Sequence, residues 1–176
     1  MIKPNFAYYN TAFCGGFYMW NKIKNYVYSI IATLAVGGIS ALLTAGSRGV
    51  YGTAQKPPLS PPSWVFPVAW TVLYILMAVS FAIVYNKRKH EPRMRRNAIN
   101  IYALNLFFNF FWSIIFFDFN AYLLAFIWLL LLWLVIFVML LNYYRTDKTA
   151  GLLLLPYLAW VTFAGYLNYG IWALNR

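Results

Sequence analysis

Long uncharged apolar blocks alternate with short polar segments along this chain of 176 residues. Each block approaches the ~20 residues that an α-helix needs to cross the hydrocarbon core of a bilayer. The blocks predict spans at about 26–46, 62–85, 98–117, 120–144 and 150–174. We therefore expect an all-α membrane protein, with a five-transmembrane-helix bundle over residues 26–176 and an N-terminal extension at 1–25.

A proline-rich segment separates the first two spans. Its proline pairs, at 57–58 and 61–62, cannot lie inside one regular helix, because proline lacks the amide donor and clashes with the preceding turn. Ser60 followed by two prolines nevertheless favours a helix start. The second helix is expected to begin near Pro61 with a kink at Pro67, or near Phe66. The segment is either a lid over a pocket or a rigid turn carrying aromatic interface anchors.

Two shorter motifs concern helix packing. Gly37, Ala41 and Ala45 recur at four-residue spacing on the first span, which permits close helix approach. This spacing favours packing within the bundle over a dimer seam. Between the third and fourth spans, FDFNA predicts a tight hairpin in which Asp118 or Asn120 caps the next helix.

Composition and charge support the membrane assignment. The chain is 63% hydrophobic and 10% charged, whereas soluble domains are about 25% charged. Eleven of the 14 Lys and Arg residues lie on the side of the N-terminus, which predicts a cytoplasmic N-terminus in the plasma membrane. The basic run at 87–97 is expected to be a connector that follows this rule, with some attraction to anionic lipid and no nucleic-acid partner.

Ionisable groups that could support acid–base chemistry are scarce. The chain has three carboxylates (Glu91, Asp118, Asp147), His90 and Cys14, all outside the apolar blocks. A hydrolase, a metalloenzyme or a proton-coupled transporter needs such groups to converge at one place. We therefore expect no acid–base catalytic site, no metal site and no required cofactor.

Polar and aromatic residues recur in helical register on three of the spans. These faces comprise Trp70 and Tyr74 on the second span, Asn109, Trp112 and Phe116 on the third, and Trp160, Ala164 and Asn168 on the fifth. The two asparagines are expected to face the interior, because an amide at membrane depth seeks a partner. The faces form either a pocket for a flat, largely apolar ligand or plain helix packing. On the fourth span, Trp128 is expected to pack or to face lipid.

Four motifs follow one another in a specific order: YGTAQKP (51–57), PPSWVFPVAWTVLY (61–74), NFFWSIIFF (109–117) and LLLLPYLAWVTFAGYLNYGIWALN (152–175). With these motifs the chain resembles the TspO/MBR family, the bacterial tryptophan-rich sensory proteins and the mitochondrial translocator protein, or peripheral benzodiazepine receptor. The resemblance implies a five-helix bundle whose pocket is covered by the loop between the first two helices. Such a pocket is expected to bind porphyrins (protoporphyrin IX, heme) and isoquinoline- or benzodiazepine-type ligands.

The resemblance also implies a set of ligand-binding positions. They are Tyr51, Pro62, Trp70, Tyr74, Asn109, Trp112, Trp160, Ala164 and Asn168. The expected function is a membrane receptor or sensor for porphyrins. The alternatives are a porphyrin or sterol translocator and a light-dependent enzyme that degrades protoporphyrin IX, for which Trp70 and Trp160 would be the catalytic tryptophans. Whether the chain is an enzyme, and whether it forms a homodimer, is left open by the sequence.

Two positions depart from the family pattern. Trp128 stands where many members carry an acidic residue on the fourth helix, which removes a polar group from that region. Arg176 follows Tyr169 with six residues between them, so the C-terminal sterol motif fails as written.

Overall fold

Six α-helices make up most of the chain in the computed structural model, which describes residues 6–46 and 54–176. They are α1 (Phe6–Leu43), α3 (Val65–Lys87), α4 (Pro92–Phe117), α5 (Tyr122–Thr146), α6 (Lys148–Leu152) and α7 (Leu155–Leu174). Five stretches are long and apolar enough to cross a membrane: Ile23–Leu43, Val65–Lys87, Pro92–Phe117, Tyr122–Thr146 and Lys148–Leu174. The expected all-α bundle of five spans is therefore confirmed.

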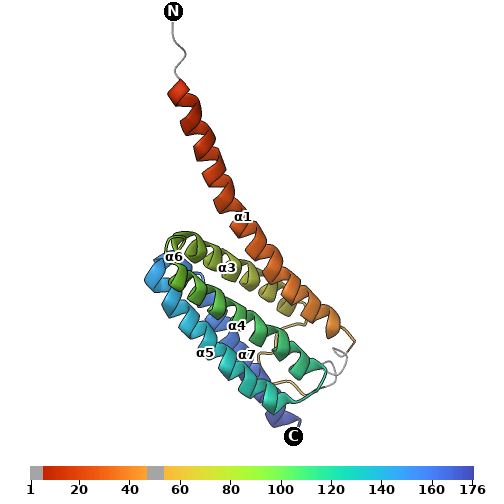
Figure 1. The fold of residues 1–176 in the computed structure, drawn as a ribbon. Helices are drawn as coiled ribbons and strands as arrows, with labels where there is room; N and C mark the ends of the chain where they lie inside the picture. Colours follow the sequence, from red (N-terminus) through yellow and green to blue (C-terminus); the bar gives the residue numbers. More distant parts are fainter. Residues whose placement is uncertain (1–5, 47–53) are drawn as a thin grey trace, which may run out of the picture.

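The long helices lie side by side in one bundle (Figure 1). α1 packs along α3 and α4, α4 packs along α5, and α5 packs along α7. α1 continues past the bundle at the end where α6 lies, and the C-terminus lies at the other end. Large apolar side chains face outward, including Leu130, Leu134 and Val138 on α5. This is the surface expected of helices in contact with lipid.

Hydroxyl side chains line the face of α1 that meets the bundle. Ser29, Thr33, Ser40 and Thr44 are all buried. The hydroxyl of Ser29 donates to the Ala78 carbonyl on α3 at 3.1 Å. Small residues contribute less to this face than their spacing predicts, because Gly37 faces α3 whereas Ala45 is exposed. The face of α1 that meets the bundle is therefore lined by polar hydroxyl groups. The predicted close packing within the bundle is confirmed at Gly37.

From residue 54 to 64, the proline segment forms no helix and contains turns at 58–59 and 63–64. α3 begins at Val65, so Ser60 does not cap it, and the Ser60 hydroxyl instead donates to the Pro57 carbonyl at 2.7 Å. Pro67 falls in the first turn, where a missing amide costs nothing. Of the two predicted helix starts, the one near Phe66 is observed. We call residues 54–64 the strap.

The basic connector is shorter than predicted. α3 includes Lys87 and α4 begins at Pro92, so only residues 88–91 form the turn. Proline is well suited to this first helical position, because the amide there has no intrahelical partner. The later basic residues of the run consequently lie on α4.

The hairpin between α4 and α5 is tight, but neither predicted residue caps α5. The N-cap position is Ala121, without a side-chain hydrogen bond. Asn120 adopts a left-handed backbone conformation (φ 50°), which asparagine tolerates. Its Oδ1 accepts a hydrogen bond from the Tyr122 hydroxyl at 3.3 Å. Asn120 therefore supplies the left-handed backbone conformation of the turn and does not cap α5, so the capping prediction was wrong.

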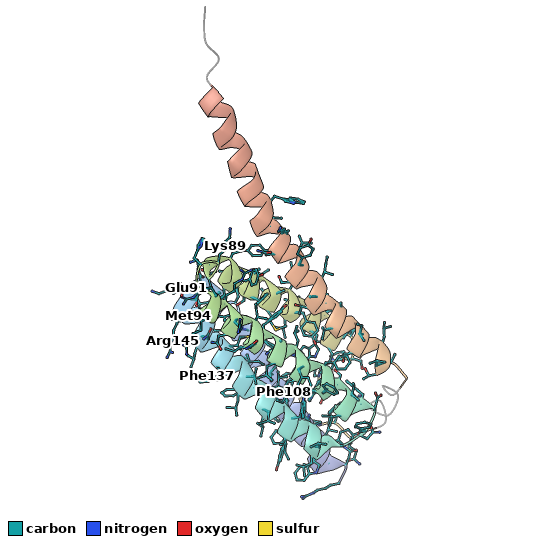
Figure 2. All side chains as sticks on the ribbon, in the orientation of Figure 1. Lys89, Glu91, Met94, Phe108, Phe137 and Arg145 are labelled. Carbon is teal, nitrogen blue, oxygen red and sulfur yellow. The ribbon has the colours of Figure 1, made fainter. Side chains whose placement is uncertain are left out.

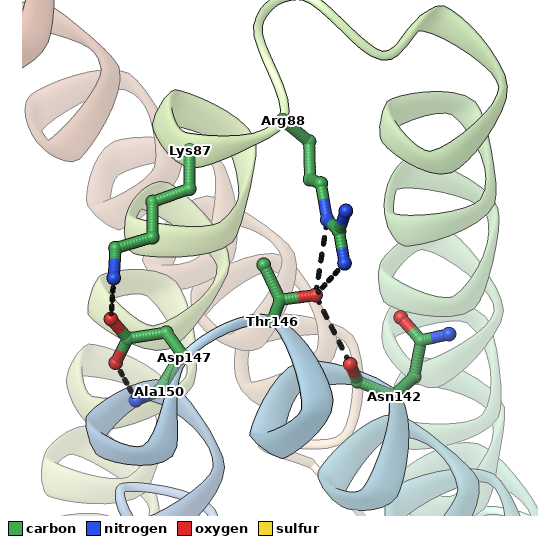
Figure 3. A network of polar contacts seen from close by, with 6 residues as sticks. All are labelled: Lys87, Arg88, Asn142, Thr146, Asp147 and Ala150. Carbon is green, nitrogen blue, oxygen red and sulfur yellow. Dashed lines mark hydrogen bonds and ion pairs between the residues drawn. The ribbon is translucent and has the colours of Figure 1, made fainter.

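The fifth span is divided into α6 and α7, with the break just before Pro156. Asp147 caps α6 by accepting a hydrogen bond from the Ala150 amide at 2.9 Å, and it also pairs with Lys87 (Figure 3). Lys87, and then the Ala150 amide, hold the pKa of the Asp147 carboxyl below its usual range. This end of the bundle is therefore fixed by polar contacts between α3 and the α5–α6 junction.

Candidate functional site: a cavity at the strap end of the bundle

A mostly apolar cavity of about 220 Å³ lies between α1, α3, α4 and α7. It is at the end of the bundle where α1 ends, α3 begins and the C-terminus lies. Its lining consists of Gly37, Ala41, Thr44, Ser63, Phe66, Pro67, Trp70, Tyr74, Asn109, Trp112, Ser113, Phe116, Phe117, Ala164, Leu167, Asn168 and Ile171. The cavity therefore brings together residues from all three faces that were predicted from helical spacing.

Aromatic rings form one continuous wall of this cavity. The ring centre of Trp70 lies 5.6 Å from that of Tyr74 and 6.0 Å from that of Trp112. Trp112 in turn stacks on Phe116 at 5.3 Å. Offset and tilted ring pairs at these separations are favourable beyond their buried area. The wall thus offers flat apolar surface to a ligand that could stack on it.

Asn168 fixes one of these rings. Its side chain is buried, and its surroundings favour the amide orientation in which Nδ2 donates to the Tyr122 carbonyl at 2.9 Å. In that orientation its Oδ1 accepts a hydrogen bond from the Trp112 indole at 3.2 Å. The amide of Asn168 is therefore engaged in holding Trp112 in place.

Asn109 has an unused acceptor at the cavity wall. Its Nδ2 donates to Asn105, to the backbone oxygen at 3.2 Å and to Oδ1 at 3.1 Å, and also to the Tyr157 hydroxyl. The Tyr157 hydroxyl donates to Asn105 Oδ1 at 3.1 Å. The Oδ1 of Asn109 is buried and has no hydrogen-bond partner in the part of the chain that the structure describes. A buried acceptor without a partner costs free energy that a ligand with an N–H or O–H donor can recover.

Six of the nine predicted site residues line the cavity, and two of the eight that the structure describes do not. The six are Trp70, Tyr74, Asn109, Trp112, Ala164 and Asn168. Trp160 is not in the lining and packs against Phe66 at 6.1 Å between ring centres. Pro62 directly precedes the lining residue Ser63, and Tyr51 lies outside the described residues. Of the two tryptophans that light-dependent degradation would use, Trp70 therefore lines the cavity and Trp160 does not.

Sequence reasoning missed the polar partners behind the cavity wall. Asn105 is fully buried and lies one helical turn before Asn109, so its spacing on α4 could have identified it. Tyr157 is also buried, and it follows Pro156 at the start of α7. Its hydroxyl reaches α4 only because the α6–α7 break sets the position of α7. No local pattern in the sequence encodes that contact.

The strap is tied to the C-terminal end of α7. The backbone of Gln55 exchanges two hydrogen bonds with the side-chain amide of Asn175, both at 2.9 Å. The Tyr166 hydroxyl donates to the Pro58 carbonyl at 2.9 Å. Pro57 lies so close to Gly170 that a Cβ there would come within 2.6 Å of its ring. The strap therefore packs against α7 at the end of the bundle that contains the cavity.

Trp128 fills the place where an acidic residue was expected from the family pattern. Its indole donates to the Phe108 carbonyl on α4 at 2.8 Å, and its ring packs on that of Phe108 at 4.8 Å. Trp128 is not part of the cavity lining. It therefore links α5 to α4, which confirms the packing role expected for it.

Known proteins of similar sequence include bacterial and animal ones. The profile of the TspO/MBR family matches residues 29–173. The chain is 38% identical to Tryptophan-rich protein TspO of Chlorobaculum tepidum over 145 residues, which is 81% of this chain and 90% of that protein. It is 35% identical to Protein CrtK of Rhodobacter capsulatus, over 82% of this chain and 89% of that protein. Identity to Translocator protein of Bos taurus is 31%, over 72% and 75% of the two chains.

Proposed function

The chain belongs to the TspO/MBR family, and on that premise we propose that it is a membrane receptor for porphyrins and related flat aromatic ligands. The ligand binds in the cavity at the strap end and stacks on the wall formed by Trp70, Tyr74 and Trp112. One observation carries the proposal: a stacking wall lies beside a buried acceptor, Asn109 Oδ1, that has no hydrogen-bond partner among the described residues. A ligand with aromatic surface and one hydrogen-bond donor complements both features.

The size of the cavity limits which ligands can bind without a change in the structure. At about 220 Å³ it is smaller than the ~300–1,000 Å³ of pockets that hold drug-sized ligands. A compact aromatic ligand fits with little change, whereas a porphyrin macrocycle requires the cavity to widen. The strap is held to α7 by hydrogen bonds in which Asn175 and Tyr166 take part. Each such bond contributes only about 1 kcal/mol, so strap movement is an accessible route to widening.

Light-dependent porphyrin degradation has less support than binding. Of the two tryptophans that such chemistry would use, Trp70 lines the cavity and Trp160 does not. Active transport is also weakly supported, because the acidic side chains Glu91 and Asp118 lie at helix ends and cannot couple ion flow through the interior. Binding is the function that the geometry supports best.

The test is ligand binding to a variant whose cavity is filled. Protoporphyrin IX is titrated into the purified protein, and quenching of tryptophan fluorescence measures its dissociation constant. Ala164→Leu places a larger side chain in the lining and should weaken binding at least about tenfold, which corresponds to ~1.4 kcal/mol. Gly165→Ala is the matched control, because a Cβ there meets Leu129 at 3.8 Å in ordinary contact. Absence of quenching at micromolar ligand, or equal binding by the two variants, would refute the proposal.

A further inference from the structure

Two acidic residues lie near the turn between α3 and α4, and each is paired with a basic side chain at the end of α3 or in the turn. Lys87 pairs with Asp147, as Figure 3 shows, and Arg88 pairs with Glu91 at 2.5 Å. Arg88 also donates two hydrogen bonds to the Thr146 hydroxyl, at 3.2 and 3.0 Å. These contacts join the turn to the α5–α6 junction and use both acids.

Three arginines lie in the first turns of α4, and two of them, Arg93 and Arg96, have no such partner among the described residues. Arg95 lies over the ring of Tyr85 at 3.8 Å, which gives it a cation–π contact. Arg93 and Arg96 are both exposed, and neither forms an ion pair or hydrogen bond with any residue that the structure describes. They lie on the exposed surface of the first turns of α4, together with Met94, Asn97 and Asn100. Two positive charges at the start of α4 are thus close together without a counter-charge among the residues that the structure describes.

The same face of α4 changes from charged to amide to apolar along the helix. At 100° per residue, seven exposed residues fall within an arc of about 100°. They are Arg93, Arg96, Asn97, Asn100, Leu104, Phe107 and Phe111. The opposite face of the helix carries buried residues, among them Tyr102 and Asn109. The gradient therefore lies on the surface that faces away from the bundle.

This gradient matches the chemistry and the length of a phospholipid in one leaflet. The eleven residue-to-residue steps from Arg96 to Phe107 rise about 16 Å, close to half of the ~30 Å hydrocarbon core. Asn97 and Asn100 have no hydrogen-bond partner among the described residues. An amide on a lipid-facing surface is costly unless something accepts its hydrogen bonds. Ester and phosphate oxygens of a lipid can do so.

We propose that the face of α4 from Arg93 to Phe111 binds one anionic phospholipid. Arg93 and Arg96 donate to the phosphate, for which the planar guanidinium is well suited. Asn97 and Asn100 donate to the glycerol ester region, and an acyl chain lies along the apolar part of the face. Met94 and Arg145 lie at the same end of the bundle (Figure 2). This site is separate from the cavity, so it stands whether or not the cavity binds porphyrin.

The test compares lipid retention by charge-matched variants. The purified protein is equilibrated in mixed micelles containing equal amounts of phosphatidylglycerol and phosphatidylcholine, and native mass spectrometry counts bound lipid. The parent should retain one phosphatidylglycerol in preference to phosphatidylcholine. Arg93→Gln with Arg96→Gln should weaken that binding roughly thirtyfold, since each basic residue near a membrane surface contributes about one factor of five. Circular dichroism checks that the variant is folded.

The control removes the same charge from the same end of the bundle. Arg145→Gln with Lys148→Gln alters two exposed basic residues on α5 and α6, and retention should stay within about threefold of the parent. Equal losses in the two double variants would overturn the site in favour of general surface attraction. Displacement by inorganic phosphate at matched concentration would overturn it in favour of a simple anion site. If the arginine variant does not fold, Asn97→Leu with Asn100→Leu keeps every charge and should still lose phosphatidylglycerol; unchanged retention there would also refute the proposal.

Discussion

Two adjacent glycines on α1 allow the contact between α1 and the cavity wall to be tested directly. A Cβ built on Gly37 would lie 2.1 Å from Cε2 and 2.7 Å from Cδ2 of Tyr74. A Cβ built on Gly38 meets nothing within 4 Å. Gly37→Ala therefore has to push the Tyr74 ring away from α1, whereas Gly38→Ala changes only the backbone propensity. The pair isolates the effect of the clash.

The expected magnitudes differ in sign. Replacing glycine by alanine inside a helix is favourable by about 0.8–1.0 kcal/mol when nothing is displaced, so Gly38→Ala should be slightly stabilising. Overpacking a filled contact costs roughly 1–3 kcal/mol, so Gly37→Ala should be neutral to destabilising by about 2 kcal/mol. The difference between the variants, ~1–3 kcal/mol, corresponds to roughly 2–12 °C in Tm at this chain length.

The same variants separate stability from binding. Tyr74 lines the cavity and its ring lies 5.6 Å from that of Trp70, so displacing it should disturb the stacking wall. Protoporphyrin IX titrated against Gly37→Ala should show a dissociation constant raised about tenfold, with Gly38→Ala unchanged. Tm is followed by tryptophan fluorescence in one detergent for both proteins. If Gly37→Ala matches Gly38→Ala in Tm and in affinity, the contact between α1 and Tyr74 does not shape the cavity.

Three further substitutions test the polar contacts. Lys87 lowers the pKa of the Asp147 carboxyl, so the ionised carboxyl should stabilise the fold above about pH 4 and lose this effect as the pH falls through its folded pKa. Asp147→Asn should therefore flatten the acid side of a plot of unfolding free energy against pH. An unchanged acid side would contradict this reasoning. Trp128→Phe keeps an aromatic ring but removes the indole N–H that donates to the Phe108 carbonyl, and the unfolding free energy in detergent should fall by about 0.6–1.7 kcal/mol from loss of that bond. Asn175→Ala releases two strap hydrogen bonds and should speed porphyrin association in stopped-flow quenching; equal rates would place the entry route elsewhere.

The spans and the polar faces of the cavity could be predicted because both depend on local periodicity. A run of apolar residues predicts a span, and an asparagine at membrane depth predicts an inward face. Both Asn109 and Asn168 are indeed buried. Helix ends were harder to predict, because the Ser60 hydroxyl donates to the Pro57 carbonyl and does not cap an amide at the start of α3. A short side chain bonds to whichever backbone group the turn brings near it.

Contacts that depend on the relative rotation of helices could not be predicted in the same way. Trp160 shares a helical face with Ala164 and Asn168, yet it packs on Phe66 and lies outside the cavity lining. One face of a helix spans about a third of its circumference, and residues eight positions apart lie about 12 Å apart along the axis. On α7 the cavity lining runs from Ala164 to Ile171, so Trp160 lies one turn beyond the end of the cavity. Spacing along a helix therefore identifies candidate lining residues, and the extent of the cavity along the bundle decides which of them line it.

The two ends of the bundle are held by different kinds of contact. At the α6 end, the Ser80 hydroxyl donates to the Ala150 carbonyl at 2.6 Å and the Tyr143 hydroxyl donates to the Ala98 carbonyl at 3.0 Å, both buried. These bonds cannot exchange with water, so breaking them is costly. At the strap end, the bonds that Asn175 makes to the strap are exposed and can be replaced by water. A ligand that needs a larger cavity should therefore widen the strap end, while the α6 end and the arginine face of α4 keep their positions.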